Sequence, residues 1–224
     1  MIIAVLTEFL GGEGKSLKRL LAVILSVLIL PVFAGCSGNK ASIIRYDLPG
    51  DPRSLDPQTA SDQASHIIIN GIFEGFFKID GTGTLQNALA TSYQLSEDGM
   101  HYSFALREDA KWTYLLDNGT LEEVPVTAHD FVFAFRRLFL ANTNAAAASR
   151  FFCIQNSQAV LRGEKKPEEL GVTAKGDYRL DFTLSSPNDG FLRLLATTYA
   201  MPCNEEFFAH TMGRYGLVGE TRCV

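Results

Sequence analysis

The stretch that decides the fold is VTAHDFVFAFRRLFL, which runs from Val126 to Leu140. Thr127 followed by Asp130 matches a capping box, in which two side chains satisfy backbone N–H groups at the start of a helix, with Asp in place of the usual Glu. Apolar residues then recur at the spacing of one helix face; they are Phe131, Val132, Phe135, Leu138 and Phe139. The pattern predicts a helix from Thr127 to about Leu140 that buries this stripe, while Arg136 and Arg137 diverge from it.

Two stretches on either side of this segment alternate polar and apolar residues. Residues 101–107 and 179–184 carry apolar residues at every second position, namely Tyr102, Phe104 and Leu106 in the first and Leu180, Phe182 and Leu184 in the second. This period is typical of half-buried strands. Lys175-Gly176-Asp177, just before the second stretch, indicates a turn.

Apolar residues at helical spacing also predict a helix over residues 62–77. Ser61 or Asp62 is suited to cap its first turn. Gly75 is available for a positive φ at its end. Strands and helices therefore alternate in irregular order, which indicates a mixed α/β or α+β fold.

Composition excludes several function classes. The chain has 224 residues, sixteen Phe and 46% hydrophobic residues, which favours a folded body. Its net charge of −5 gives no basic footprint for nucleic acid. The four His are scattered, and no Cys or His spacing matches a metal site, so neither a metal nor a cofactor is expected. No Gly-x-Ser-x-Gly motif is present, and no enzyme activity is expected.

The N-terminus has the pattern of an export signal. A basic cluster of Lys15, Lys18 and Arg19 precedes an uncharged apolar run from Leu20 to Phe33. That run is shorter than the roughly 20 residues that cross a bilayer as a helix. Residues 1–35 are therefore predicted to be a secretory signal peptide.

Phe33-Ala34-Gly35-Cys36 resembles the lipobox of bacterial lipoproteins, whose cysteine is acylated and becomes the mature N-terminus. The resemblance implies that Cys36 carries a diacylglycerol and that residues 36–41 form a lipidated tether. The protein would then lie on the extracytoplasmic face of the cell membrane, held by more than one acyl chain. The alternative is an uncleaved membrane helix with an incidental cysteine.

Export permits disulfides among the remaining cysteines. Cys153 and Cys203 form the favoured pair, which would close a loop of about 50 residues and contribute roughly 4 kcal/mol in the chain-entropy model. Two buried free thiols are the open alternative.

Several motifs occur together in a fixed order. They are Ser54-Leu55-Asp56-Pro57, residues 70–76 (NGIFEGF), residues 102–112 (YSFALREDAKW), residues 126–137 (VTAHDFVFAFRR) and residues 201–206 (MPCNEE). Their order and spacing resemble the family 5 extracellular solute-binding proteins, the oligopeptide- and dipeptide-binding lipoproteins of ABC importers. The resemblance covers roughly residues 43–217, and we expect an incomplete family domain over residues 42–218.

The resemblance implies a type II periplasmic-binding-protein fold, in which two lobes close over an oligopeptide by hinge motion. The closed monomer would then dock on the importer's permease subunits. Family members are much longer than this chain, so the second lobe is expected to be missing. Residues 219–224 resemble nothing in the family, which favours a truncation. A non-functional remnant and a ligand-sensing lipoprotein without a transport role are the alternatives.

The resemblance also marks candidate ligand contacts. Ser61, Asp62 and Gln63 match the loop that touches the peptide backbone in the oligopeptide-binding relatives, although Ser61 and Asp62 could instead only cap the helix. Where peptide-binding relatives carry a ligand-contacting tyrosine, this chain has the alanines of residues 145–148. The resemblance also places the family's anchor for the peptide amino terminus in the missing half, so the isolated chain is expected to bind peptide weakly or not at all.

Overall fold

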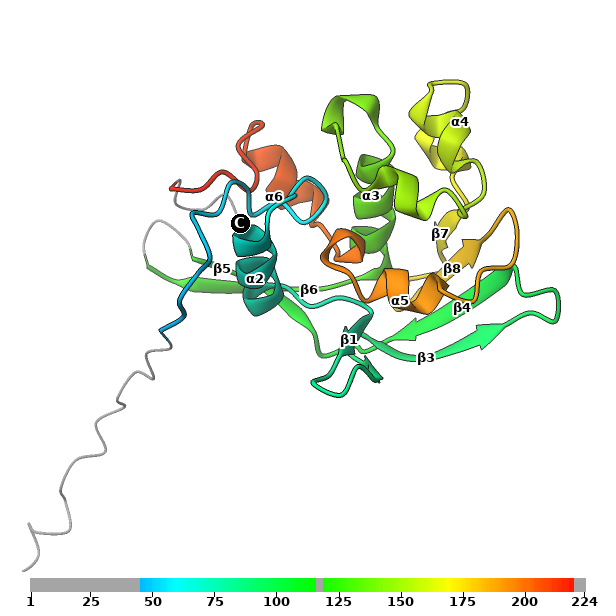
Figure 1. Cartoon of the computed structure of the whole chain (residues 1–224), viewed down its shortest axis with the longest axis horizontal. Helices are drawn as coiled ribbons and strands as arrows, with labels where there is room; N and C mark the ends of the chain where they lie inside the picture. Colours follow the sequence, from blue (N-terminus) through cyan, green and yellow to red (C-terminus); the bar gives the residue numbers. More distant parts are fainter. Residues whose placement is uncertain (1–44, 116–118, 220–224) are drawn as a thin grey trace, which may run out of the picture. The chain divides into compact units, whose positions relative to one another are not determined.

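The computed structural model describes residues 45–115 and 119–219. The predicted signal peptide (residues 1–35) and the whole of the predicted tether (residues 36–41), which includes Cys36, lie outside these residues. The regular elements follow one another in mixed order (Figure 1). They are α2 (Gln63–Ile72), β1 (Phe77–Ile79), β2 (Leu85–Asn87), β3 (Ala90–Leu95), β4 (His101–Leu106), β5 (Lys111–Leu115), β6 (Leu121–Pro125), α3 (Ala128–Leu138), α4 (Ser157–Leu161), β7 (Val172–Ala174), β8 (Arg179–Thr183), α5 (Phe191–Leu195) and α6 (Glu205–His210). The mixed α/β class predicted from the sequence is confirmed.

The two predicted strands lie side by side in the central sheet. The sheet has the antiparallel order β3-β4-β8-β7, and β4 pairs Tyr102 with Phe182 and Phe104 with Leu180. Between β7 and β8 the chain turns at Gly176, whose φ is +85°, as the turn motif predicted. The apolar side chains of β4 and β8 face α3 and α5, which lie on the same side of the sheet (Figure 1).

Helix α3 begins as predicted. The side chain of Asp130 accepts a hydrogen bond from the backbone N–H of Thr127 at 2.7 Å, which closes the capping box. The predicted apolar stripe is buried, and Phe131 packs against Phe76 with ring centroids 4.2 Å apart. The prediction for Arg137 is wrong, because its side chain is only 6% exposed. The helix is enclosed on several sides, so a single apolar stripe does not describe its burial.

Helix α2 is shorter than its predicted range. Phe73 at its end is already extended, with φ −113° and ψ 158°. The chain then leaves the helix, so that Phe76 enters the core and Phe77 starts β1. Gly75 does not have a positive φ, which corrects the expectation of a glycine cap. The tertiary packing of Phe76 outweighs the helical periodicity that includes it.

A hairpin of β5 and β6 precedes α3. The Nε1–H of Trp112 on β5 donates to Oδ2 of Asp130 at 3.2 Å, which joins the hairpin to the capped end of α3. Residues 116–118, between β5 and β6 in the sequence, lie outside the described part of the chain.

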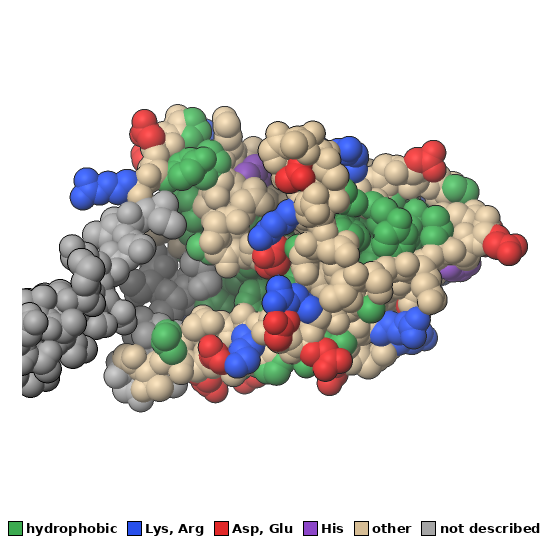
Figure 2. All heavy atoms as spheres, turned by 90° about the horizontal axis from the view of Figure 1, so that it is seen from below, with side chains coloured by type: hydrophobic (Ala, Val, Ile, Leu, Met, Phe, Trp, Pro, Cys, Tyr) green, Lys and Arg blue, Asp and Glu red, His purple; other side chains and the backbone are tan. Residues whose placement is uncertain are grey.

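The surface is mixed in charge. In Figure 2, acidic and basic side chains are interspersed over the face shown, with hydrophobic side chains gathered between them. Within residues 45–115 and 119–219, no helix is long and apolar enough to cross a membrane. The same residues contain no group of three or more metal-ligating side chains placed to hold an ion.

Candidate functional site

The predicted contact residues Ser61, Asp62 and Gln63 lie together at the start of α2. Asp62 is its N-cap, and its carboxylate accepts from the backbone N–H of Ser65 at 2.9 Å and from the Ser65 hydroxyl at 2.7 Å. Although desolvation acts to raise it, these hydrogen bonds lower the pKa of Asp62. Asp62 is thus a cap, while Ser61 and Gln63 on either side of it are exposed to solvent.

One turn further along α2, His66 links this loop to the 3-10 helix η5 (Thr198–Ala200). The Nδ1 atom of His66 lies 2.8 Å from the Thr198 hydroxyl, and Nε2 lies 3.1 Å from the Tyr199 hydroxyl. A neutral imidazole has one N–H donor and one acceptor nitrogen, so one of the hydroxyls donates to the ring and the other accepts from it. Burial lowers the pKa of His66, and the nearby charge of Arg150 acts in the same direction.

A positively charged side chain also lies over the ring of Tyr199. The guanidinium of Arg150, from the 3-10 helix η3 (Ala148–Phe151), lies over the Tyr199 ring at 5.8 Å from its centroid. Arg150 is exposed and Tyr199 is half-buried. Three segments far apart in the sequence therefore meet at one surface, beside residues 61–63. The sequence prediction missed Arg150, His66 and Tyr199, because only tertiary contacts bring them together.

A buried ion pair holds the loop that leads into α2. The NH2 group of Arg137 lies 2.6 Å from Oδ2 of Asp56, and its NH1 donates to Oε1 of Gln58 at 2.8 Å. The guanidinium also lies 4.1 Å from the ring centroid of Phe208. Gln58 in turn donates to the backbone carbonyl of Met201 at 3.0 Å. These contacts fix the approach to residues 61–63 against α3 and the segment around Met201.

Cys153 and Cys203 are both free thiols, so the favoured disulfide is not formed in this structure. The two residues belong to different hydrophobic clusters. Cys153 packs against the main hydrophobic core, and Cys203 packs with Ala134 and Tyr215. The Sγ atom of Cys203 accepts a hydrogen bond from Arg137 at 3.4 Å. Burial raises the pKa of Cys203 to about 11, so the thiol is protonated at neutral pH.

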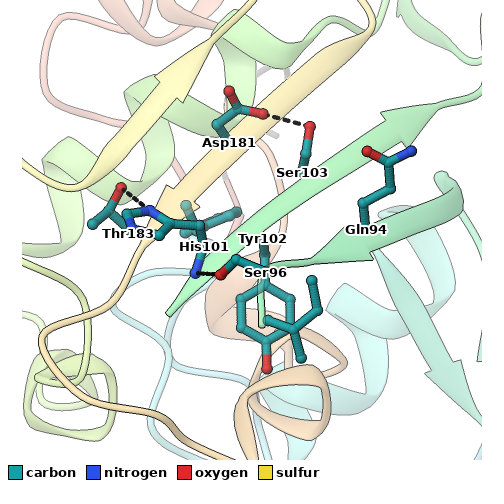
Figure 3. Close-up of a pocket in the computed structure, with 9 residues that line it drawn as sticks. Gln94, Ser96, His101, Tyr102, Ser103, Asp181 and Thr183 are labelled. Carbon is teal, nitrogen blue, oxygen red and sulfur yellow. Dashed lines mark hydrogen bonds between the residues drawn. The ribbon is translucent and has the colours of Figure 1, made fainter. Parts of the chain in front are cut away.

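A shallow hollow of about 350 Å³ lies on the outer face of the sheet (Figure 3). Its polar side chains bond mainly to one another. The Ser103 hydroxyl donates to Asp181 at 2.6 Å and accepts from Nε of Arg179 at 2.9 Å. Nδ1 of His101 lies 3.4 Å from the Thr183 hydroxyl rather than beside Ser103. Ser103 is therefore bonded to Asp181 and Arg179 rather than to the histidine base that a serine hydrolase needs.

A family model described as the bacterial extracellular solute-binding proteins, family 5, matches residues 84–214. The dipeptide-binding protein DppE of Bacillus subtilis is 32% identical over 173 residues, which cover 77% of this chain and 30% of DppE. The periplasmic oligopeptide-binding protein OppA of Haemophilus influenzae is 38% identical over 139 residues, which cover 61% of this chain and 24% of that protein.

A solved structure, Listeria monocytogenes OppA bound to peptide, superposes with a TM-score of 0.66 at 37% identity. The match covers 73% of this chain and 31% of that one. The chain thus spans about a third or less of the length of the relatives that it matches.

Proposed function

The chain belongs to the family 5 bacterial extracellular solute-binding proteins, and we propose that it forms part of a peptide-binding lobe that serves an ABC importer. Its similarity to DppE and to peptide-bound OppA supports this proposal. In this proposal the chain binds its ligand without chemical change, and the importer supplies the energy for transport.

The observation that carries the proposal is the position of residues 61–63. Ser61 and Gln63 are exposed at the start of α2, while the loop before them is fixed by the Asp56–Arg137 ion pair. A fixed loop can offer backbone groups to an extended peptide with little loss of entropy on binding. We propose that Ser61, Asp62 and Gln63 contact the backbone of the peptide, as in strand addition. Asp62 would do so through its backbone, because its side chain is occupied by the cap.

The isolated chain is expected to bind peptide only weakly. A lobe that contacts one side of a ligand leaves the other side in water, so much of the contact area of a closed cleft is lost. We expect a Kd in roughly the millimolar range, which corresponds to about 4 kcal/mol. The test is a titration of the ¹⁵N-labelled chain with trialanine, followed by backbone NMR shifts. Shifts centred on residues 61–63 support the proposal.

Two results would contradict these expectations about the affinity and the position of the peptide. Micromolar or tighter binding by calorimetry would show that one lobe is sufficient. Shifts confined to the hollow on the outer face of the sheet would place the peptide elsewhere. A variant with Gln63→Ala should weaken the binding, whereas Gln86→Ala, on an exposed strand residue remote in the sequence, serves as the matched control.

We further propose that Cys36 anchors the exported protein to the membrane through lipid, beside the importer's permease. The basic cluster, the apolar run and the lipobox-like Phe33-Ala34-Gly35-Cys36 support this proposal. The wild-type chain expressed in a bacterial host should partition with membranes, and mass spectrometry should find a diacylglycerol on an N-terminal Cys36. Cys36→Ser should remove both properties. A wild-type protein that keeps residues 1–35 and an unmodified thiol would contradict the proposal.

A further inference from the structure

The position of Arg150 is fixed by its buried neighbour in the sequence. Its neighbour Phe151 is fully buried and packs edge-to-face on Phe135 of α3, with ring centroids 5.6 Å apart. The short helix η3 is therefore anchored in the core while Arg150 emerges at the surface. Within the described residues, no carboxylate lies within ion-pair distance of Arg150.

The surface beneath the guanidinium is also held in place. The Tyr199 hydroxyl is bonded to His66, and the backbone carbonyl of Tyr199 accepts from Nε2 of Gln58 at 3.4 Å. The His66 and Tyr199 rings meet edge to face at 5.1 Å. A guanidinium that lies over an aromatic ring keeps the N–H groups of its edge available, and those groups match the two oxygens of a carboxylate.

Arg150 lies on the same side as the proposed peptide contacts. The Tyr199 ring beneath Arg150 carries the hydroxyl that lies 3.1 Å from Nε2 of His66, and His66 follows Asp62 by one turn of α2. Helix α2 and η5 pack against each other (Figure 1). A peptide whose backbone lies along residues 61–63 could therefore bring a carboxylate to the guanidinium.

We propose that Arg150, held over Tyr199, selects peptides that present a carboxylate to this lobe. The inference rests on the proposed function, because it assigns a specificity residue to that same site. The carboxylate has two sources, the C-terminus of the peptide and an acidic side chain. Both offer the same two-oxygen acceptor, and the experiment separates them.

The test compares three peptides in NMR titrations of the ¹⁵N-labelled chain: trialanine, trialanine amide and Ala-Glu-Ala amide. A charge-assisted hydrogen bond is stronger than a neutral one, so a recognised carboxylate should improve affinity about tenfold over trialanine amide. Tighter binding of trialanine alone identifies the C-terminus as the source. Tighter binding of Ala-Glu-Ala amide alone identifies the side chain.

Variants connect the preference to Arg150. Arg150→Gln should reduce the affinity of the preferred carboxylate peptide to that of trialanine amide. Arg150→Lys should keep only part of the preference, because an ammonium lacks the planar fork. Arg162→Gln is the matched control, since Arg162 is also exposed but bonds to Glu164 at 2.7 Å; it should behave as wild type. An unchanged amide spectrum in each variant shows that the fold is intact.

The outcomes distinguish the inference from the function on which it rests. Equal affinity for the three peptides, or a carboxylate preference that persists in Arg150→Gln, overturns the inference and leaves the peptide-binding proposal standing. If none of the peptides perturbs residues 61–63, the proposed function and the inference both fall.

Discussion

Arg137 keeps a charge inside the protein because its partners replace most of the water that it loses. Desolvation opposes the charged form, but the hydrogen bonds that Arg137 donates to the Asp56 carboxylate, together with the charge of that carboxylate, prevail and raise the pKa of Arg137. Its Nε has no hydrogen-bond partner among the described residues, so the compensation is incomplete. The stability of the fold depends on keeping both partners of such a pair. If one partner is removed, the remaining buried charge destabilises the protein far more than the intact pair does.

We therefore predict that Arg137→Met destabilises the protein by about 3–5 kcal/mol, because it leaves the Asp56 carboxylate buried and unpaired. The double variant Arg137→Met with Asp56→Leu should recover part of this loss. The surface pair of Arg162 and Glu164 is the control, and Arg162→Met should change stability little, because water solvates both exposed groups. Urea unfolding measures all three. A double variant no more stable than Arg137→Met alone would contradict this account.

His66 makes stability depend on pH. Its pKa is lowered in the folded state, chiefly by burial, so folding favours the neutral ring. The contribution is fully present above the unfolded pKa of about 6.5 and is lost as the pH falls through the lowered folded value. We predict that the free energy of unfolding decreases between pH 7 and pH 5, and that this decrease is smaller in His66→Asn.

His129→Asn provides the comparison, because His129 is exposed and its side chain is 65% accessible. Its pH profile should follow that of the wild type. If His66→Asn shows the same loss between pH 7 and pH 5 as the wild type, His66 is not the group responsible. The measurement is urea unfolding at half-unit pH steps.

At the scale of elements, the sequence pattern predicted those elements whose formation depends on residues close to one another in the chain. The period-2 stretches gave β4 and β8, and the Thr127–Asp130 spacing gave the start of α3. The end of α2 could not be predicted in this way, because Phe76 satisfies the helical period and yet packs on Phe131 of a distant helix. The burial of Arg137 likewise depends on Asp56, a residue 81 positions away.

The turn after α6 lies directly against the loop before α2, and this close approach is possible because Gly216 has no side chain. Its φ is +75°, and a Cβ there would lie 2.2 Å from the backbone N of Asp56. The carbonyl of Gly216 also accepts from the N–H of Leu55 at 2.7 Å. Gly213, three residues earlier, has a φ of +83° but open space around it.

This contrast predicts two different costs. Gly213→Ala should lose roughly 1–2 kcal/mol, the cost of a left-handed alanine. Gly216→Ala should lose roughly 1–3 kcal/mol more, because the added methyl group also displaces the Asp56 loop. Thermal unfolding of the two variants measures the difference. Equal losses would show that the loop moves aside freely, and that the close contact has little energetic weight.

For the whole molecule, the sequence could mark residues 61–63 only through family resemblance, and it gave no sign of Arg150 and Tyr199. Arg150 on η3 and Tyr199 on η5 are far apart in the sequence and come together only through tertiary packing, so no local spacing of residues predicts their contact. The same reasoning explains the cysteines. The predicted export permitted a bond between Cys153 and Cys203, but the chain packs them in different clusters.

The molecule should accordingly be held together by packing, without a Cys153–Cys203 bond. Peptide mapping by mass spectrometry after alkylation without reductant should find both cysteines modified once the protein is unfolded. Under native conditions Cys203 should react more slowly than Cys153, because it is fully buried and protonated at neutral pH, while Cys153 is partly accessible. A cross-linked peptide that contains both residues would contradict the arrangement, since it would require the two clusters to exchange their packing.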